Sequence, residues 1–126
     1  MLKYCIYLFA LSLFIISCSK EKDESPPNIM VTQPVSGQQI NALDTVPIVF
    51  SVNDDENVKG ISISLRNSND DIVAQTISKT VNAKEYQFND TYILNNVHLQ
   101  SGAYYFDISA NDGENTSHKF IHVNLN

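Results

Sequence analysis

Two short acidic segments hold the residues that could bind a metal ion. Asp54, Asp55 and Glu56 are consecutive, and Asp112 and Glu114 flank a single glycine much later in the chain. Calcium prefers oxygen ligands and takes about six to eight of them, so these five residues are the calcium candidates. Their spacing is not that of an EF-hand loop, and acidic residues are also ordinary turn residues. We therefore expect no calcium site tighter than millimolar and no resident metal.

The remaining reactive residues do not predict an enzyme. The histidines are His98, His118 and His122, and the last two would lie about 13 Å apart on one strand, too far to share a zinc ion. The sequence has no nucleophile-elbow motif, no phosphate-binding glycine loop and no zinc-protease motif. Adjacent acids such as Asp54 and Asp55 need not converge on a substrate. We expect no catalytic residues and no cofactor.

The first residues of the chain predict export. Lys3 precedes an apolar run over residues 6–16 that only Ser12 interrupts. This run has the length of a signal-peptide hydrophobic region and is too short for a bilayer span, which needs about 20 apolar residues. A buried core helix is the alternative, but the charge, the apolar run and the small residue before Cys18 occur in the order of a signal peptide.

The residues Ile15-Ile16-Ser17-Cys18 resemble the lipobox of bacterial lipoproteins. The resemblance implies cleavage before Cys18, which would become the lipidated first residue and attach the protein to a membrane. Several acyl chains, such as palmitate, would give firm anchoring. The charged residues 19–24 resemble the export signal of Bacteroidetes surface lipoproteins, which implies a lipid-anchored protein on the surface of the bacterial outer membrane. An ordinary solvated tether remains the alternative for this segment.

Charge and cysteine content exclude some partners and stabilising features. The chain has a net charge of −6, with no cluster of Lys or Arg, so we expect no nucleic-acid partner and no adhesion to anionic lipid by charge alone. Loss of Cys5 with the leader and lipidation of Cys18 would leave no disulfide. The body must then be stabilised by packing alone.

Alternating apolar residues predict an all-β body after a polar segment that ends in two prolines. The pattern gives about seven short strands, separated by turn residues. They fall at residues 29–31, 46–52, 61–65, 72–77, 86–94, 104–110 and 121–125, with a polar loop expected at 53–57. This is the pattern of an antiparallel β-sandwich. We therefore divide the chain into a signal peptide (1–17), a lipidated cysteine with a flexible tether (18–28) and a sandwich domain (29–126).

The segment from Leu99 to Tyr104, followed by the Asp112-Gly113 turn, resembles bacterial immunoglobulin-like and fibronectin-III-like domains. More narrowly, residues 27–125 resemble the Ig-like domain of Bacteroidetes lipoproteins. That topology would bring the two acidic segments to one end of the sandwich, nearest the membrane. It also implies a tyrosine corner in which the Tyr104 hydroxyl bonds to backbone near Leu99. The alternative for Tyr104 is an ordinary core aromatic with a solvent-exposed hydroxyl.

Two functions follow as expectations. The first is a non-catalytic interaction or spacer module on the cell surface, with an unknown protein partner. The alternative is a glycan-binding accessory protein of a polysaccharide-uptake system, with Tyr105 and Phe120 as outward-facing aromatic candidates. The lack of tryptophan weakens the glycan hypothesis. Edge-strand pairing with a partner or a second copy is a third possibility.

Overall fold

The computed structural model describes residues 18–94 and 98–126, and the described chain is all β. The predicted signal peptide, residues 1–17, lies outside the described residues. Within the described ranges, the chain has no helix that is long and apolar enough to cross a membrane. The described residues form six strands: β1 (Asn28–Gln33), β2 (Gln38–Ile40), β3 (Thr45–Asn67), β4 (Ile77–Ile93), β5 (Gly102–Asn111) and β6 (Thr116–Leu125).

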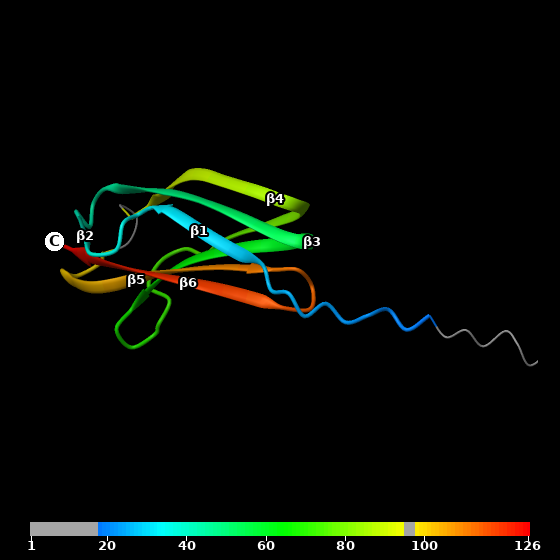
Figure 1. Ribbon diagram of the computed structural model, residues 1–126. Coiled ribbons are helices and arrows are strands. Elements are labelled where there is room, and N and C mark those ends of the chain that lie inside the picture. The colour runs from blue at the N-terminus through cyan, green and yellow to red at the C-terminus, as the bar shows by residue number, and fades with distance from the viewer. Residues whose placement is uncertain (1–17, 95–97) are drawn as a thin grey trace, which may run out of the picture.

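A long ribbon made by β3 and β4 contributes to both layers of the sandwich. The two antiparallel strands stay paired along most of their length, with register shifts between Asn53 and Gly60. Figure 1 shows the ribbon folding back on itself at this place. Residues 49–53 of β3 pair with β1, whereas residues 60–67 pair with β5. The two halves of the ribbon therefore lie in different layers.

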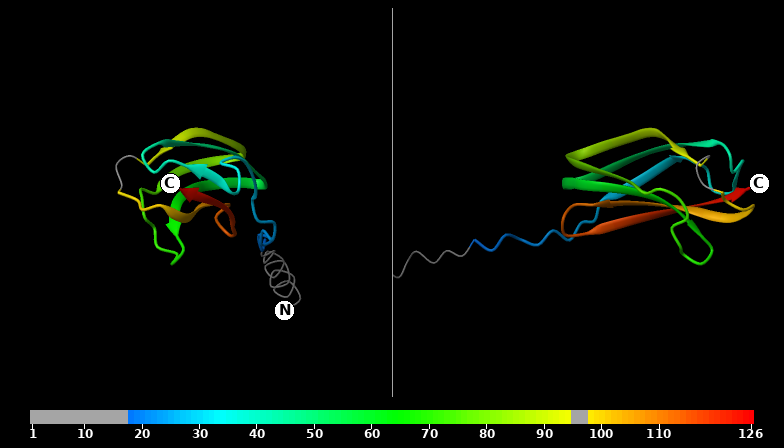
Figure 2. Two further views of the ribbon diagram at one scale, coloured as in Figure 1. Left: turned by 90° about the vertical axis from the view of Figure 1, so that its left-hand side faces the viewer. Right: turned by 180° about the vertical axis from the view of Figure 1, so that it is seen from behind.

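The other strands complete the layers around this ribbon. The hydrogen-bonded order is β1-β3-β5-β6-β2, with β4 paired to β3. All pairs are antiparallel except β2 with β6, which are parallel over three residue pairs. The tether and the C-terminus lie at opposite ends of the molecule (Figure 2). The fold-back of β3 and the β5–β6 turn share the tether's end.

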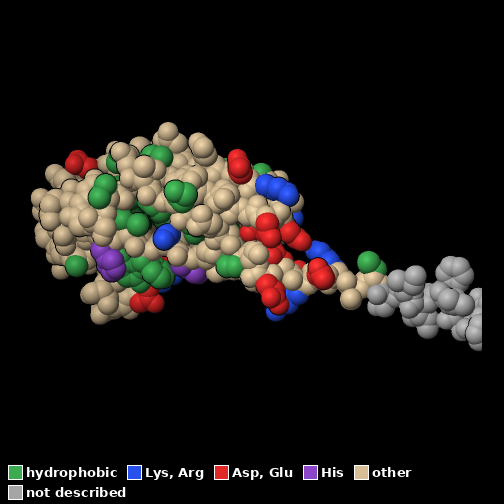
Figure 3. All heavy atoms as spheres, viewed as in Figure 1, with side chains coloured by type: hydrophobic (Ala, Val, Ile, Leu, Met, Phe, Trp, Pro, Cys, Tyr) green, Lys and Arg blue, Asp and Glu red, His purple; other side chains and the backbone are tan. Residues whose placement is uncertain are grey.

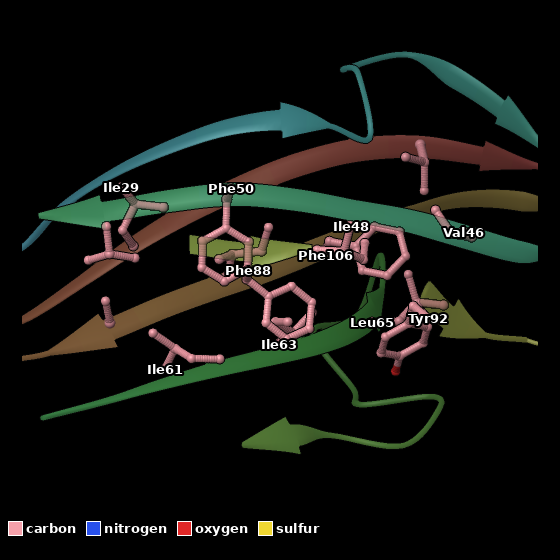
Figure 4. Close-up of a cluster of buried hydrophobic side chains, with 14 of the residues drawn as sticks. Ile29, Val46, Ile48, Phe50, Ile61, Ile63, Leu65, Phe88, Tyr92 and Phe106 are labelled. Atoms are coloured by element: carbon pink, nitrogen blue, oxygen red, sulfur yellow. The ribbon is translucent and has the colours of Figure 1, made fainter. Parts of the chain in front are cut away.

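The core lies between the layers and consists of the alternating apolar residues of the strands (Figure 4). Phe50 and Phe88 are partners across the β3–β4 pair and stack with ring centroids 5.2 Å apart. Tyr92 of β4 meets Phe106 of β5 edge-on at the same centroid distance, 5.2 Å. Since these two strands do not pair with each other, the Tyr92–Phe106 contact is made by packing across the core.

The predicted all-β sandwich is confirmed, but the strand boundaries differ from the prediction. Residues 53–57, expected as a loop, belong to β3, so two expected strands are one. Residues 72–76, expected in a strand, are in none; Ile72 makes only an isolated bridge to Arg66. The Asn67 side chain accepts the N–H groups of Asn69 and Asp71 at 2.9 Å each. This turn chemistry competes with strand pairing, and the apolar pattern alone does not reveal it.

The tyrosine corner is present. The Tyr104 hydroxyl donates to the backbone carbonyl of Gln100 at 2.9 Å. This bond fixes the start of β5 against the segment that precedes it, as the resemblance implied.

Candidate functional site

The structure places both acidic segments at the end of the sandwich where the tether arrives. Asp54 and Asp55 lie in the fold-back of β3, and Asp112 and Glu114 lie in the β5–β6 turn. Figure 3 shows acidic side chains gathered at this end. Asp23 of the tether joins them, and carboxylate oxygens of Asp23, Asp54 and Asp55 lie within 4.8 Å of one another. We call these five residues the acidic end.

The tether is attached to the β5–β6 turn by two hydrogen bonds. The Asp23 N–H donates to Oε2 of Glu114 at 2.9 Å, and Nδ2 of Asn115 donates to the Asp23 carbonyl at 3.0 Å. Pro27, just before β1, is buried. An open hollow of about 500 Å³ lies between the tether and the fold-back of β3. It is lined by Glu21, Lys22, Asp23, Glu24, Ser25, Asp55 and Glu56.

The pKa values of Asp54 and Asp112 are shifted in opposite directions. Burial, followed by the charges of Asp112, Asp23 and Asp55, raises the pKa of Asp54, and its Oδ2 has no hydrogen-bond partner among the described residues. Burial also acts to raise the pKa of Asp112, but hydrogen bonds from Asn115 and from the Glu114 backbone outweigh it, so the net pKa is lowered. Asp112 is 8% exposed, and its Oδ1 accepts the backbone N–H groups of Glu114 and Asn115, each at 2.6 Å.

This geometry gives the acidic end little capacity for a tightly held cation. The oxygens of Asp112 are occupied by the turn, since Oδ1 accepts two backbone N–H groups and Oδ2 accepts Asn115 Nδ2 at 3.0 Å. Three carboxylates remain close together and bring one oxygen each within 4.8 Å of the others, and three oxygens are fewer than the roughly six to eight that calcium takes. The expectation of no calcium site tighter than millimolar therefore stays a prediction. The candidates Glu56 and Glu114 are not among the three carboxylates that lie within 4.8 Å of one another.

The two candidate aromatic residues meet on the outer face of the β5–β6 pair. Phe120 is 54% exposed, and its ring meets the ring of Tyr105 edge-on with centroids 5.7 Å apart. His122 lies 5.5 Å from Tyr105, and His118 lies 5.8 Å from Phe120 in a stacked arrangement. Tyr105, Phe120 and His122 line a shallow hollow of about 180 Å³. We call these four residues the aromatic face, and Figure 3 shows hydrophobic and histidine side chains together on this side.

A chain of polar contacts runs beside the aromatic face. The half-buried guanidinium of Arg66 lies 3.5 Å from a carboxylate oxygen of both Asp70 and Asp107. Asp107 is largely buried and contacts Nδ1 of His118 at 2.8 Å. The Tyr105 hydroxyl donates to Asp70, and this bond is the first cause of the raised pKa of Tyr105. The network therefore fixes the orientation of rings at both sides of the hollow.

Comparison with known proteins identifies the fold but no family. No family model matches the chain, and no curated protein does. Among solved structures, 79% of this chain matches the fibronectin(III)-like modules of Clostridium thermocellum CbhA at 15% identity, with a TM-score of 0.51. The fold is fibronectin(III)-like. The match spans 46% of that chain.

A second match covers part of a longer chain. Wild-type OgpA from Akkermansia muciniphila matches 85% of this chain at 13% identity, with a TM-score of 0.59. A catalytically inactive OgpA in complex with an O-glycopeptide, glycodrosocin, matches at 14% identity with the same TM-score, 0.59. The present chain spans less than a third of OgpA, 30% and 31% of the two chains. At these sequence identities the similarity shows a shared fold and no more.

Several site residues were not among the sequence candidates. Asp23 had no distinguishing signal, because it is one of several charges in a polar segment. Asp107 did have one, since alternation along β5 places it on the same side as Tyr105. Arg66 is the direct partner of Tyr105 across β3 and β5, but that pairing register is not visible in the sequence. Cys18, the predicted lipidation site, is exposed and free at the outer end of the described tether.

Proposed function

We propose that this protein is a lipid-anchored lipoprotein of the bacterial outer-membrane surface whose fibronectin(III)-like domain is a non-catalytic interaction or spacer module. The observation that carries the proposal is the arrangement of the ends. The tether arrives at the acidic end, and β6 finishes at the opposite end of the sandwich (Figure 2). A domain attached through Cys18 would hold its far end away from the membrane.

The absence of recognisable catalytic motifs from the sequence supports a non-catalytic role. The described residues support it as well. Asp112 is occupied by a turn, and Asp107 is held by Arg66 and His118. Both carboxylates therefore serve the body of the domain.

The anchor is tested by replacing Cys18 with Ser in the producing bacterium. We expect the variant to leave the membrane fraction and to lose incorporation of labelled palmitate. Serine at position 19, replaced by Ala, is the matched control and should leave both readouts unchanged. Retention of the Cys18→Ser variant in the membrane pellet, with palmitate still incorporated, would contradict the proposal.

A second candidate function, glycan binding as an accessory of polysaccharide uptake, is favoured by the aromatic face. Exposed rings are the groups on which β-sandwich sugar binders stack their ligands, and here Tyr105 and Phe120 are adjacent and border one hollow. The neighbour OgpA has been solved with an O-glycopeptide, although the likeness to it is one of fold. A broad glycan array tests this function. Binding that Tyr105→Ala abolishes would support it, and silence across the array would exclude it.

A further inference from the structure

The size of the aromatic face indicates what class of ligand it can hold. The hollow of about 180 Å³ is lined by three side chains, Tyr105, Phe120 and His122. A stable protein–protein interface buries about 800 Å² on each partner, far more than three side chains provide. The hollow is open on its outer side, so it does not enclose a ligand as an aromatic cage encloses a quaternary ammonium group. A flat ring lying on Phe120 fits this shape.

Two of the hydrogen-bonding side chains beside the hollow, Tyr105 and Arg66, are directed at Asp70 and Asp107. The Tyr105 hydroxyl donates to the Asp70 carboxylate. Arg66 donates from one terminal nitrogen to the Asp70 carbonyl at 2.8 Å, and its Nε, 3.5 Å from Asp107, is buried without a hydrogen-bond partner among the described residues, out of reach of a ligand. These groups have little left to offer an incoming acceptor.

Two acceptors beside the hollow are free, one on His118 and one on Asp70. A carboxylate can only accept, so the 2.8 Å contact with Asp107 places the hydrogen of a neutral His118 on Nδ1 and leaves Nε2 as an acceptor. The His118 side chain is 46% exposed and its ring is next to Phe120, so Nε2 can reach solvent there. The Asp70 side chain is 75% exposed and has a second oxygen available. A ligand that satisfies this rim must bring hydrogen-bond donors.

We propose that the aromatic face binds an uncharged sugar ring, whose apolar side stacks on Phe120 and whose hydroxyl groups donate to His118 Nε2 and to Asp70. This inference rests on the glycan-binding function proposed above and names its ligand class. Acidic sugars are disfavoured because their carboxylates bring acceptors and negative charge to a rim that already has both. Choline is disfavoured because it carries no hydrogen-bond donor on its ammonium group.

The test is binding of the full chain, in detergent, to three sets of probes: neutral oligosaccharides, oligosaccharides containing uronic or sialic acid, and choline. We expect neutral oligosaccharides alone to bind. Phe120→Ala should weaken that binding about tenfold, or about 1.4 kcal/mol, and Phe120→Tyr should restore most of it, because tyrosine keeps a ring on which the sugar can stack. His118→Ala should weaken it about five- to tenfold, as expected for one lost hydrogen bond.

Met30→Ala is the matched control, because Met30 is 63% exposed and lies on β1, away from the aromatic face. It should leave binding unchanged, and Met30→Ala and the Phe120 variants should keep the thermal unfolding midpoint of the parent protein. Binding of acidic oligosaccharides that Phe120→Ala abolishes would overturn the ligand class while leaving glycan binding intact. Binding of choline, or of no probe at all, would overturn both.

Discussion

The backbone N–H of Asp23, in the tether, donates to the carboxylate of Glu114, in the β5–β6 turn, at 2.9 Å and across 91 residues of sequence. The tether therefore does not simply precede the domain. It is held against the acidic end before the first strand begins.

Glu114→Ala should release this attachment. We expect faster hydrogen exchange at the Asp23 amide and faster proteolysis within residues 19–25, because the acceptor of that amide is gone. The free energy of unfolding should change by less than about 0.5 kcal/mol, since the side chain is exposed. Glu56→Ala removes the same charge at the same end and should leave exchange unchanged. Equal protection in both variants would show that the bond does not hold the tether.

Asp112→Ala should destabilise the domain by about 1–3 kcal/mol, because two backbone N–H groups of the β5–β6 turn lose their acceptor. Asp112→Asn retains an acceptor oxygen and should recover most of the loss in chemical denaturation. The lowered pKa of Asp112 adds a pH dependence. Its charge stabilises the fold above the ordinary pKa of an aspartate, and this contribution is lost as the pH falls through the lowered pKa. Equal stability of the Ala and Asn variants would contradict this role.

Asp54→Asn should stabilise the protein at pH 7 by up to about 1 kcal/mol, since it removes a like charge from the acidic end. The raised pKa of Asp54 means that the protonated form is favoured in the folded state. Protonated Asp54 adds its whole contribution to the free energy of unfolding below the ordinary pKa of an aspartate. This contribution is lost as the pH rises through the raised pKa. The gain from Asp54→Asn should therefore vanish in acid. Asp55→Asn, at an exposed neighbour, should give a smaller gain, and destabilisation by Asp54→Asn at pH 7 would refute the argument.

Calcium should bind the acidic end no more tightly than millimolar. Three carboxylates within 4.8 Å provide too few ligands for a tight site. Titration calorimetry of the full chain should show no heat of binding at micromolar calcium, and the thermal unfolding midpoint should not rise at that concentration. Micromolar binding that disappears in Asp54→Asn would contradict the prediction.

Tyr92 should make the fold sensitive to alkali. Burial raises its pKa to about 12, above the ordinary value of 10.0, so the unfolded chain ionises at a lower pH than the folded one. Its contribution to stability is full below the ordinary pKa and is lost as the pH rises through about 12, an effect of about 2–3 kcal/mol. Tyr92→Phe should remove this part of the alkaline slope, at the cost of the bond to the Gln75 carbonyl. An unchanged slope would show that Tyr92 does not carry it.

The fold class could be predicted from the sequence because each layer buries one face. Alternation at Ile61, Ile63 and Leu65, for example, places these residues in the core, and all three are buried. The fold-back of β3 could not be predicted in the same way. Asp54 and Asp55 have the composition of a loop, yet backbone pairing with β4 continues on both sides of them.

The candidate site could be predicted only in part. The predicted placement of the two acidic segments at one end depended on the resemblance. The prediction that Tyr105 and Phe120 face outward depended on strand alternation. The network through Arg66 and Asp70 depends instead on the conformation of residues 67–76, which the side chain of Asn67 closes by local hydrogen bonds. Such contacts are set by the geometry of one turn, and the hydrophobic pattern holds no information on them.

The placement of the two termini has a mechanical consequence. A pull applied between the tether and Asn126 runs along the strands, because the two points lie at opposite ends of the sandwich (Figure 2). Such a load acts across the β1–β3 and β2–β6 hydrogen bonds, which are nearly perpendicular to the strands in the first pair and slanted in the second. The bonds of each pair would then be strained together in shear instead of opening one after another. In this direction the domain should resist forced unfolding better than a sandwich pulled from a single end.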